Sequence, residues 1–270
     1  EMSTSDWSSD VCSSDLSSRK VRLVYEEQVR IMENKKSEWK YDEGKANHAL
    51  LFIENFCRQS KGDFGGKLLK LELWQKALVA ATFGFVHKKT GLRKYTTVFL
   101  DIGRKNGKST LSSAIGLYGL IADGELGAEI YAAATKKDQA KIIWNESKKM
   151  VKKSPDLLKH IKVRVAEMEA EITDSYFRYL GSDSDTQDGL NVHFALLDEI
   201  HAWKTKELYD VIVDGEAARK QPLTFITTTA GTVRESIFDI LYDQAEQIIN
   251  GYGDPNGYKD ERMQIGRAHV

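Results

Sequence analysis

Residues 103–109, Gly-Arg-Lys-Asn-Gly-Lys-Ser, have the composition of a loop that binds phosphate. They follow an apolar, β-branched run at 96–102 and precede a helical pattern at 110–121. Backbone N–H groups at a helix start point at an anion, and the helix dipole favours negative charge there. Lys108 would then reach the β- and γ-phosphates of a nucleotide, and the Ser109 hydroxyl would ligate Mg²⁺.

The spacing of the two glycines departs from the usual phosphate-loop pattern, which has four residues between them. Three residues separate Gly103 from Gly107. An ordinary basic turn between a strand and a helix is therefore the alternative. The flanking strand and helix favour the phosphate loop, because they are the context in which such a loop works.

A second segment could hold the metal and activate water. The apolar run 192–197 ends in Asp198 and Glu199, as expected for a buried parallel strand that carries carboxylates at its carboxyl end, where ligands bind in open α/β sheets. Asp198 would hold Mg²⁺, and Glu199 would orient the attacking water or take its proton. His201 is either structural or a γ-phosphate sensor. We expect Lys108 and the two acids to meet one triphosphate at the tips of adjacent strands.

Two further segments could take part in the same site. Residues 222–231 predict a buried strand that ends in threonines and a glycine, and hydroxyls beside a γ-phosphate can change partners when it leaves. A threonine-rich strand end without such a role is the alternative. Gln75 lies in the first turn of a predicted helix about 30 residues before the loop, where its amide could read adenine or simply pack.

These segments must be positioned by an α/β fold with a mostly parallel sheet flanked by helices. Hydrophobic periodicity predicts the following elements. Helices are expected at 19–36, 45–58, 71–85, 110–121, 137–153, 204–219 and 235–250, and strands at 96–102, 129–134, 192–198 and 222–231, with two or three more within 161–180.

Both ends of the chain resemble translated sequencing-adapter DNA, at residues 6–16 and 265–270. We therefore expect 1–16 and 265–270 to be cloning scars and exclude them from fold reasoning. The predicted organisation is a helical segment at 17–66, a nucleotide-binding domain at 67–250 and the start of a linker at 251–264. The gene product is then expected to be a fragment.

Composition places the chain among globular proteins. The formal net charge is −1, and it becomes about +2 without the two ends, which carry four acids and one arginine, so charge is no argument for or against nucleic acid. Outside those ends only Cys57 remains, which fits a reducing cytosol. Apolar runs stay below the roughly 20 residues of a membrane span. We expect a soluble, intracellular protein with no membrane partner.

With these residues in place, the chain resembles the ATPase domain of the large terminase subunit of tailed phages. The resemblance covers about residues 45–255, and the shortened phosphate loop is the form that this family uses. The matching segments are 73–75 (Leu-Trp-Gln), 103–109, 134–140, 188–191 (Asp-Gly-Leu-Asn), 196–203 and 228–231 (Thr-Thr-Ala-Gly).

This resemblance implies a P-loop NTPase fold of the ASCE, RecA-like type and an ATP-driven motor that packages double-stranded DNA. It implies a portal protein, a small terminase subunit and a ring of subunits as partners, and ATP with Mg²⁺ as cofactors. The implied catalytic residues are Glu199, Arg104 and Lys108, with metal contacts from Ser109 and Asp198. The implied nucleotide contacts are Gln75, Gly103, Arg104, Lys105, Asn106, Gly107, Lys108, Ser109 and Thr110, and the implied coupling segment is Thr228, Thr229, Ala230 and Gly231.

Two alternatives and one exclusion accompany this interpretation. A helicase-like ATPase also fits the Asp198–His201 signature, although such enzymes need a second arginine-bearing domain. A non-catalytic assembly module is the alternative from another class. Large terminases also carry a nuclease domain with clustered acids, and we expect no nuclease activity because no such cluster precedes the end of this chain.

Overall fold

The structure is a computed structural model that describes residues 19–181, 189–229, 236–252, 254, 256–258 and 260–268. Within these residues, the main sheet has eight strands in the order β10-β3-β9-β8-β4-β7-β6-β5. The strands are β3 (Thr97–Ile102), β4 (Glu129–Ala134), β5 (Lys162–Val163), β6 (Met168–Ala170), β7 (Ser175–Gly181), β8 (Val192–Asp198), β9 (Leu223–Thr228) and β10 (Met263–Ala268).

The part of the sheet that carries the candidate site is parallel. Neighbouring strands from β10 to β7 pair in parallel, and only β6 and β5 pair antiparallel. All seven residues of β8 are buried, as expected of a central strand with helices on both faces. The predicted α/β class with a mostly parallel, helix-flanked sheet is confirmed.

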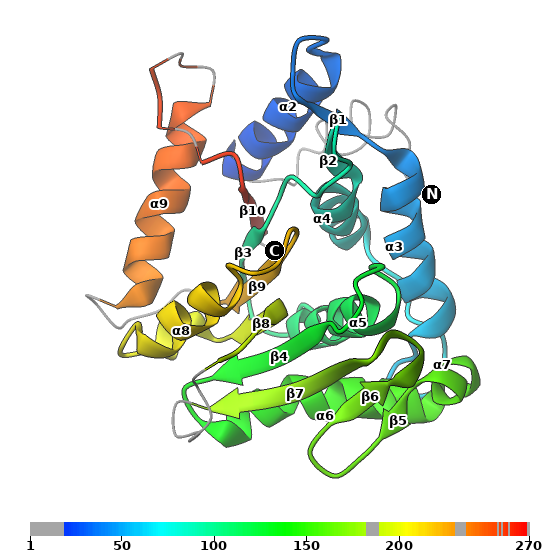
Figure 1. The fold of residues 1–270 in the computed structure, drawn as a ribbon. Coiled ribbons are helices and arrows are strands. Elements are labelled where there is room, and N and C mark those ends of the chain that lie inside the picture. The colour runs from blue at the N-terminus through cyan, green and yellow to red at the C-terminus, as the bar shows by residue number, and fades with distance from the viewer. Residues whose placement is uncertain are drawn as a thin grey trace.

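Helices cover both faces of this sheet (Figure 1). The helices are α2 (Arg19–Glu33), α3 (Glu43–Phe56), α4 (Leu73–Gly84), α5 (Lys108–Ile121), α6 (Lys137–Lys153), α7 (Pro155–His160), α8 (Glu207–Gly215) and α9 (Ile237–Gly251), with short 3₁₀ turns η2 (Glu171–Thr173) and η3 (Ile200–Ala202). One hydrophobic core joins the sheet to α3, α4, α5 and α6, and a second joins it to α8 and α9.

Helix α5 lies unusually close to the sheet, which fixes the position of its first residue, Lys108. A Cβ atom added to Gly119 would lie 2.4 Å from the Phe194 ring in β8, and one added to Gly116 would lie 2.7 Å from Leu196. Glycine at these two positions therefore permits the close approach of helix and strand.

Most predicted elements appear near their expected bounds, and four features differ. Helix α7 was not predicted, and Pro155 is its first residue. Helix α8 covers only Glu207–Gly215 of the expected 204–219. The segments β1 (Trp39–Tyr41) and β2 (Phe85–His87) form a small antiparallel sheet that periodicity did not indicate. The expected linker and scar at the carboxyl end instead contain β10, which pairs in parallel with β3.

Strand β10 forms because its first three side chains are apolar or find a partner at the sheet edge. Met263 and Ile265 are buried, and buried Gln264 accepts a hydrogen bond from Gln28 of α2 at 2.7 Å.

The origin of residues 1–16 and 265–270 stays a prediction. Within the described residues, no helix has the length and apolarity that a bilayer crossing requires.

Candidate nucleotide-binding site

The loop at 103–107 is held in a turn by its own residues. Gly107 adopts a left-handed conformation (φ 74°, ψ 17°) and caps α5. The Asn106 side-chain amide donates to the Gly103 carbonyl at 3.1 Å and more weakly to that of Arg104 at 3.4 Å. Lys105 also has a positive φ, 67°. This tight loop leads directly into α5, whose first N–H groups can bind an anion.

The amine of Lys108 lies between the loop and the acids of β8. The residue is 7% exposed, and its Nζ donates to the Ile102 carbonyl at 3.4 Å. The same Nζ lies 3.6 Å from Glu199 Oε1. The expected convergence of this amine with Glu199 is therefore present. The expectation of adjacent strands is wrong, because β9 lies between β3 and β8.

Asp198 is a buried carboxylate whose Oδ1 is fixed by two donors. Thr227 of β9 donates its hydroxyl at 2.8 Å, and the Glu199 backbone N–H donates at 3.0 Å. Burial raises the pKa of Asp198 above its usual value, while the Thr227 hydrogen bond lowers it in part. Because both donors contact Oδ1, Oδ2 is the oxygen left for a cation or for its bound water.

Glu199 adopts a left-handed backbone conformation (φ 50°, ψ 47°), which is unfavourable for a residue with a side chain. Among the described residues only two other non-glycine residues share a positive φ, and one of them is Lys105. Such outliers gather at functional sites, where the surrounding structure maintains them. Here His201 Nδ1 lies 3.1 Å from Glu199 Oε2, and Thr229 donates to that oxygen at 3.4 Å.

Two cavities flank the loop, and together they suit a nucleotide. The first, of about 340 Å³, is lined by Arg104, Lys108, Ser109, Thr110 and Glu199, among others. The second, of about 460 Å³, lies on the side of Gln75 and is lined by Trp74, Gln75, Lys105, Asn106, Gly107 and Thr110. Cations on the first side suit the phosphates, and the amide and indole on the second suit a base.

The oxygen of the Gln75 amide already has a hydrogen-bond partner at the start of α4, and its nitrogen faces the loop. Its Oε1 accepts the Glu72 backbone N–H at 3.0 Å in a capping box at the start of α4. Its Nε2 lies close to Gly107, where an added Cβ would be only 3.3 Å away. The structure thus brings Gln75 to the loop, as expected. Ala230 and Gly231 of the expected coupling segment lie outside the described residues, whereas Thr228 and Thr229 lie at the site.

Sequence reasoning missed the segment between α3 and α4 that lines both cavities. Gln59 lines both, and Ser60 and Lys61 line the phosphate side. Buried Glu146 of α6 holds this segment, because it accepts a hydrogen bond from Ser60 and its Oε2 lies 3.7 Å from Lys61 Nζ. Sequence spacing alone did not connect this segment to a helix some 80 residues further along the chain.

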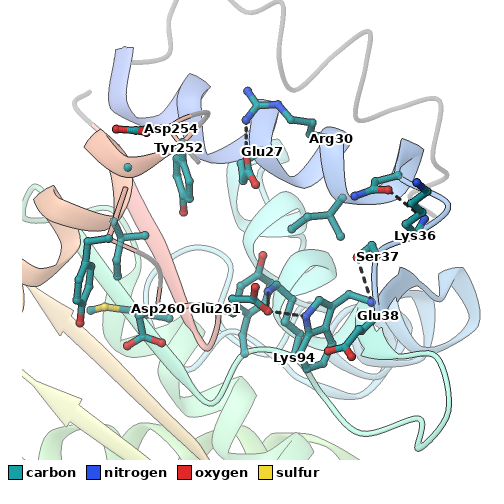
Figure 2. Close-up of a pocket in the computed structure, with 18 residues that line it drawn as sticks. Glu27, Arg30, Lys36, Ser37, Glu38, Lys94, Tyr252, Asp254, Asp260 and Glu261 are labelled. Atoms are coloured by element: carbon teal, nitrogen blue, oxygen red, sulfur yellow. Dashed lines mark hydrogen bonds and ion pairs between the residues drawn. The ribbon is translucent and has the colours of Figure 1, made fainter. Parts of the chain in front are cut away.

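Another cavity, of about 600 Å³, lies away from this site, between α2, the β1 region and the segment that follows α9 (Figure 2). Its buried cation is Lys94, whose Nζ lies 3.8 Å from Glu261 and 4.8 Å from the centre of the Trp39 ring. Burial lowers the pKa of Lys94 to about 8. No residue with an expected catalytic role lines this cavity.

Comparison with known proteins places this geometry in a family. The family model described as the terminase large subunit, ATPase domain, matches residues 73–247, which include the loop, both acids and the end of β9. The chain belongs to this family.

Individual relatives agree with this assignment. The terminase large subunit of Enterobacteria phage HK97 is 26% identical over 206 residues, covering 74% of this chain and 40% of the relative. That of Lactococcus phage p2 is 22% identical over 246 residues, covering 87% and 44%. This chain thus spans less than half the length of these terminases.

Solved structures agree on the fold. The HK97 large terminase superposes with a TM-score of 0.68 at 22% identity over 83% of this chain and 43% of that one. The ATPase domain of the Thermus phage P74-26 large terminase gives a TM-score of 0.51 at 18% identity over 73% and 80%. The predicted P-loop fold is thereby confirmed for this terminase ATPase domain.

Proposed function

We propose that this terminase chain hydrolyses ATP with Mg²⁺ and couples hydrolysis to the packaging of double-stranded DNA into a phage procapsid. The observation that carries the proposal is the 3.6 Å contact between Lys108 Nζ and Glu199 Oε1 beside the cavity of about 340 Å³. The contact brings both groups to one reaction centre, and once a nucleotide separates them the amine can hold the γ-phosphate while the carboxylate orients the attacking water.

Each residue at the phosphate side has a proposed task. Lys108 exchanges its contact with Glu199 for the β- and γ-phosphates, which frees the carboxylate. Glu199 then orients a water for attack on the γ-phosphorus and takes its proton as the bond from the γ-phosphorus to the β,γ-bridging oxygen breaks and ADP leaves. Arg104 lines the same cavity and is exposed, so it can reach the transferring phosphate. Ser109 and Asp198 would hold Mg²⁺, which would supply positive charge to neutralise the phosphates.

The remaining assignments concern the base, the coupling segment and the partners. Gln75 contacts adenine, and the loop residues Gly103, Lys105, Asn106, Gly107 and Thr110 surround the phosphates. Thr228–Gly231 couples hydrolysis to movement. Residues 67–250 form the ATPase domain after a helical segment at 17–66. The assembled motor includes duplex DNA, a portal protein, a small terminase subunit and further copies of the chain, and it works in the host cytoplasm.

Phosphate release measured with and without duplex DNA tests the proposal. We expect ATP turnover by the wild type, and we expect Glu199→Gln to bind ATP and leave it uncleaved. Glu207→Gln, an exposed glutamate of α8, is the matched control and should retain turnover. Unchanged hydrolysis by Glu199→Gln would exclude Glu199 as the carboxylate that activates water.

A strand-displacement assay separates the motor from a helicase-like enzyme. A packaging motor translocates on duplex DNA without separating its strands, so we expect no displaced strand while ATP is consumed. Strand separation would support the helicase-like alternative. Negligible turnover by the wild type under both conditions would instead support an assembly module.

A further inference from the structure

One imidazole nitrogen contacts two different parts of the proposed active site. His201 Nδ1 lies 3.1 Å from Glu199 Oε2 and also 3.1 Å from Thr228 Oγ1. His201 belongs to η3, immediately after the acids, while Thr228 is the last residue of β9. The side chain of His201 is 18% exposed, so few waters can compete for these contacts.

The surrounding hydrogen bonds decide which ring nitrogen carries the proton. The Thr228 hydroxyl lies 3.1 Å from the Thr229 carbonyl, and when it donates there its oxygen is free to accept from the ring. An ionised Glu199 carboxylate likewise only accepts. Two acceptors therefore face Nδ1, and a bare Nδ1 lone pair would be repelled by both. This arrangement favours the tautomer of the neutral ring that carries its hydrogen on Nδ1.

We propose that His201 is a two-position donor whose single Nδ1–H is directed either to the Glu199 carboxylate or to the Thr228 hydroxyl. This rests on the proposed ATPase function of the site. When Nδ1–H is directed to Glu199, His201 joins Lys108 and Thr229 in holding that carboxylate. When Nδ1–H is directed to Thr228, Oε2 of Glu199 is released to orient water. His201 is thus a positioning residue that acts through Glu199.

The proposal gives β9 a physical route to the reaction. A shift of Thr228 by a few tenths of an ångström changes which acceptor is nearer, because the two distances are equal in this structure. Binding of a nucleotide at the phosphate site also changes which acceptor is favoured, because it draws Lys108 away from Glu199. The same hydrogen therefore links the state of the phosphate site to the position of the coupling strand.

Imidazole ¹⁵N NMR of the wild-type chain tests the proton assignment without any turnover. The chain contains six histidines, and the signal of His201 is the one lost in His201→Gln. We expect a protonated, pyrrole-type Nδ1 and a bare Nε2 in the neutral ring. A pyridine-type Nδ1 would overturn the proposal, even if the chain hydrolyses ATP normally.

Kinetics of Thr228 variants test the switch. Thr228→Val removes one acceptor and keeps the shape of the side chain, so Nδ1–H of His201 should remain directed to Glu199. We therefore expect kcat to fall at least tenfold with KM for ATP unchanged. Thr228→Ser retains the hydroxyl and should stay within about threefold of wild type. Thr82→Val, a buried threonine that bonds only within α4, is the control for the substitution itself.

Three results would contradict the switch and are distinguishable from failure of the ATPase proposal. They are a Thr228→Val enzyme with wild-type kcat, one whose loss lies in KM, and a Thr228→Ser enzyme as slow as the valine variant. If Thr228→Val does not fold, Thr228→Ala removes the same hydroxyl acceptor and should show the same loss of kcat. A wild type without ATPase activity refutes the proposed function, whereas the NMR result stands alone.

Discussion

Replacing Glu216 with glutamine should remove a pH-dependent loss of stability without changing the nucleotide site. Glu216 follows α8, and its carboxyl accepts a hydrogen bond from Thr224 near the start of β9, at the end opposite the acids. Burial raises the pKa of Glu216 from 4.5 to about 7, and the Thr224 hydrogen bond and the charge of Arg93 offset this only in part.

The sign of the effect follows from the raised pKa. The folded state binds a proton that the unfolded state has already released between about pH 4.5 and 7. The stabilisation is therefore complete below the unfolded pKa and is lost as the pH rises through the folded one. At about 1.36 kcal/mol per pKa unit, the ionisation of Glu216 should lower the wild type's free energy of unfolding by about 2–3 kcal/mol between pH 5 and pH 8.

Chemical denaturation of wild type and Glu216→Gln across this range measures the effect. The two proteins should be similar at pH 5, and the variant should be more stable by about 2 kcal/mol at pH 8, or roughly 4–8 °C in Tm for a chain of this size. Other groups, including Lys94, titrate in both proteins and cancel in the difference. Parallel pH profiles for the two proteins would refute the reasoning, and Glu207→Gln, whose carboxyl is exposed, should show no such gain.

Three further substitutions test the site and its support. Lys108→Ala should abolish binding of a fluorescent ATP analogue while the far-UV circular dichroism stays native, and near-normal turnover would refute the phosphate-loop assignment. Asp198→Asn should raise the Mg²⁺ concentration for half-maximal turnover at least tenfold, and an unchanged Mg²⁺ titration would exclude Asp198 as the metal residue. Gly119→Ala should lower the free energy of unfolding, measured in urea, by about 1–3 kcal/mol, because its Cβ would lie 2.4 Å from the Phe194 ring. Wild-type stability of this variant would show that α5 can move away from the sheet.

Local patterns predicted the elements that carry the chemistry. The strand, loop and helix around Gly107 were recognisable because β-branched residues, glycine and helix-forming residues follow one another within a short window. The acids at the end of β8 were recognisable for the same reason. Each prediction needed only neighbours in sequence, and the structure contains each of these elements.

Strand order and side-chain register lie outside such a window. That β9 separates β3 from β8 depends on how three distant segments pair, and Asp198 faces Thr227 only because the register of β8 and β9 aligns them. The contact of Ser60 with Glu146 likewise joins residues far apart in the chain. Alternation and propensity carry no information about such partners, which explains why the contact of Thr227 with Asp198 and that of Glu146 with Ser60 were not predicted.

The inserted strand β9 explains why the acids of β8 and the threonines after Ile226 form one unit. Thr227 contacts Asp198 and Thr229 contacts Glu199. Thr228, the last residue of β9, contacts His201, whose Nδ1 also contacts Glu199. The left-handed backbone at Glu199 turns the chain into η3, which carries His201. A movement of β9 must therefore disturb all three contacts together, which couples the metal residue, the proposed catalytic carboxylate and the imidazole to a single strand.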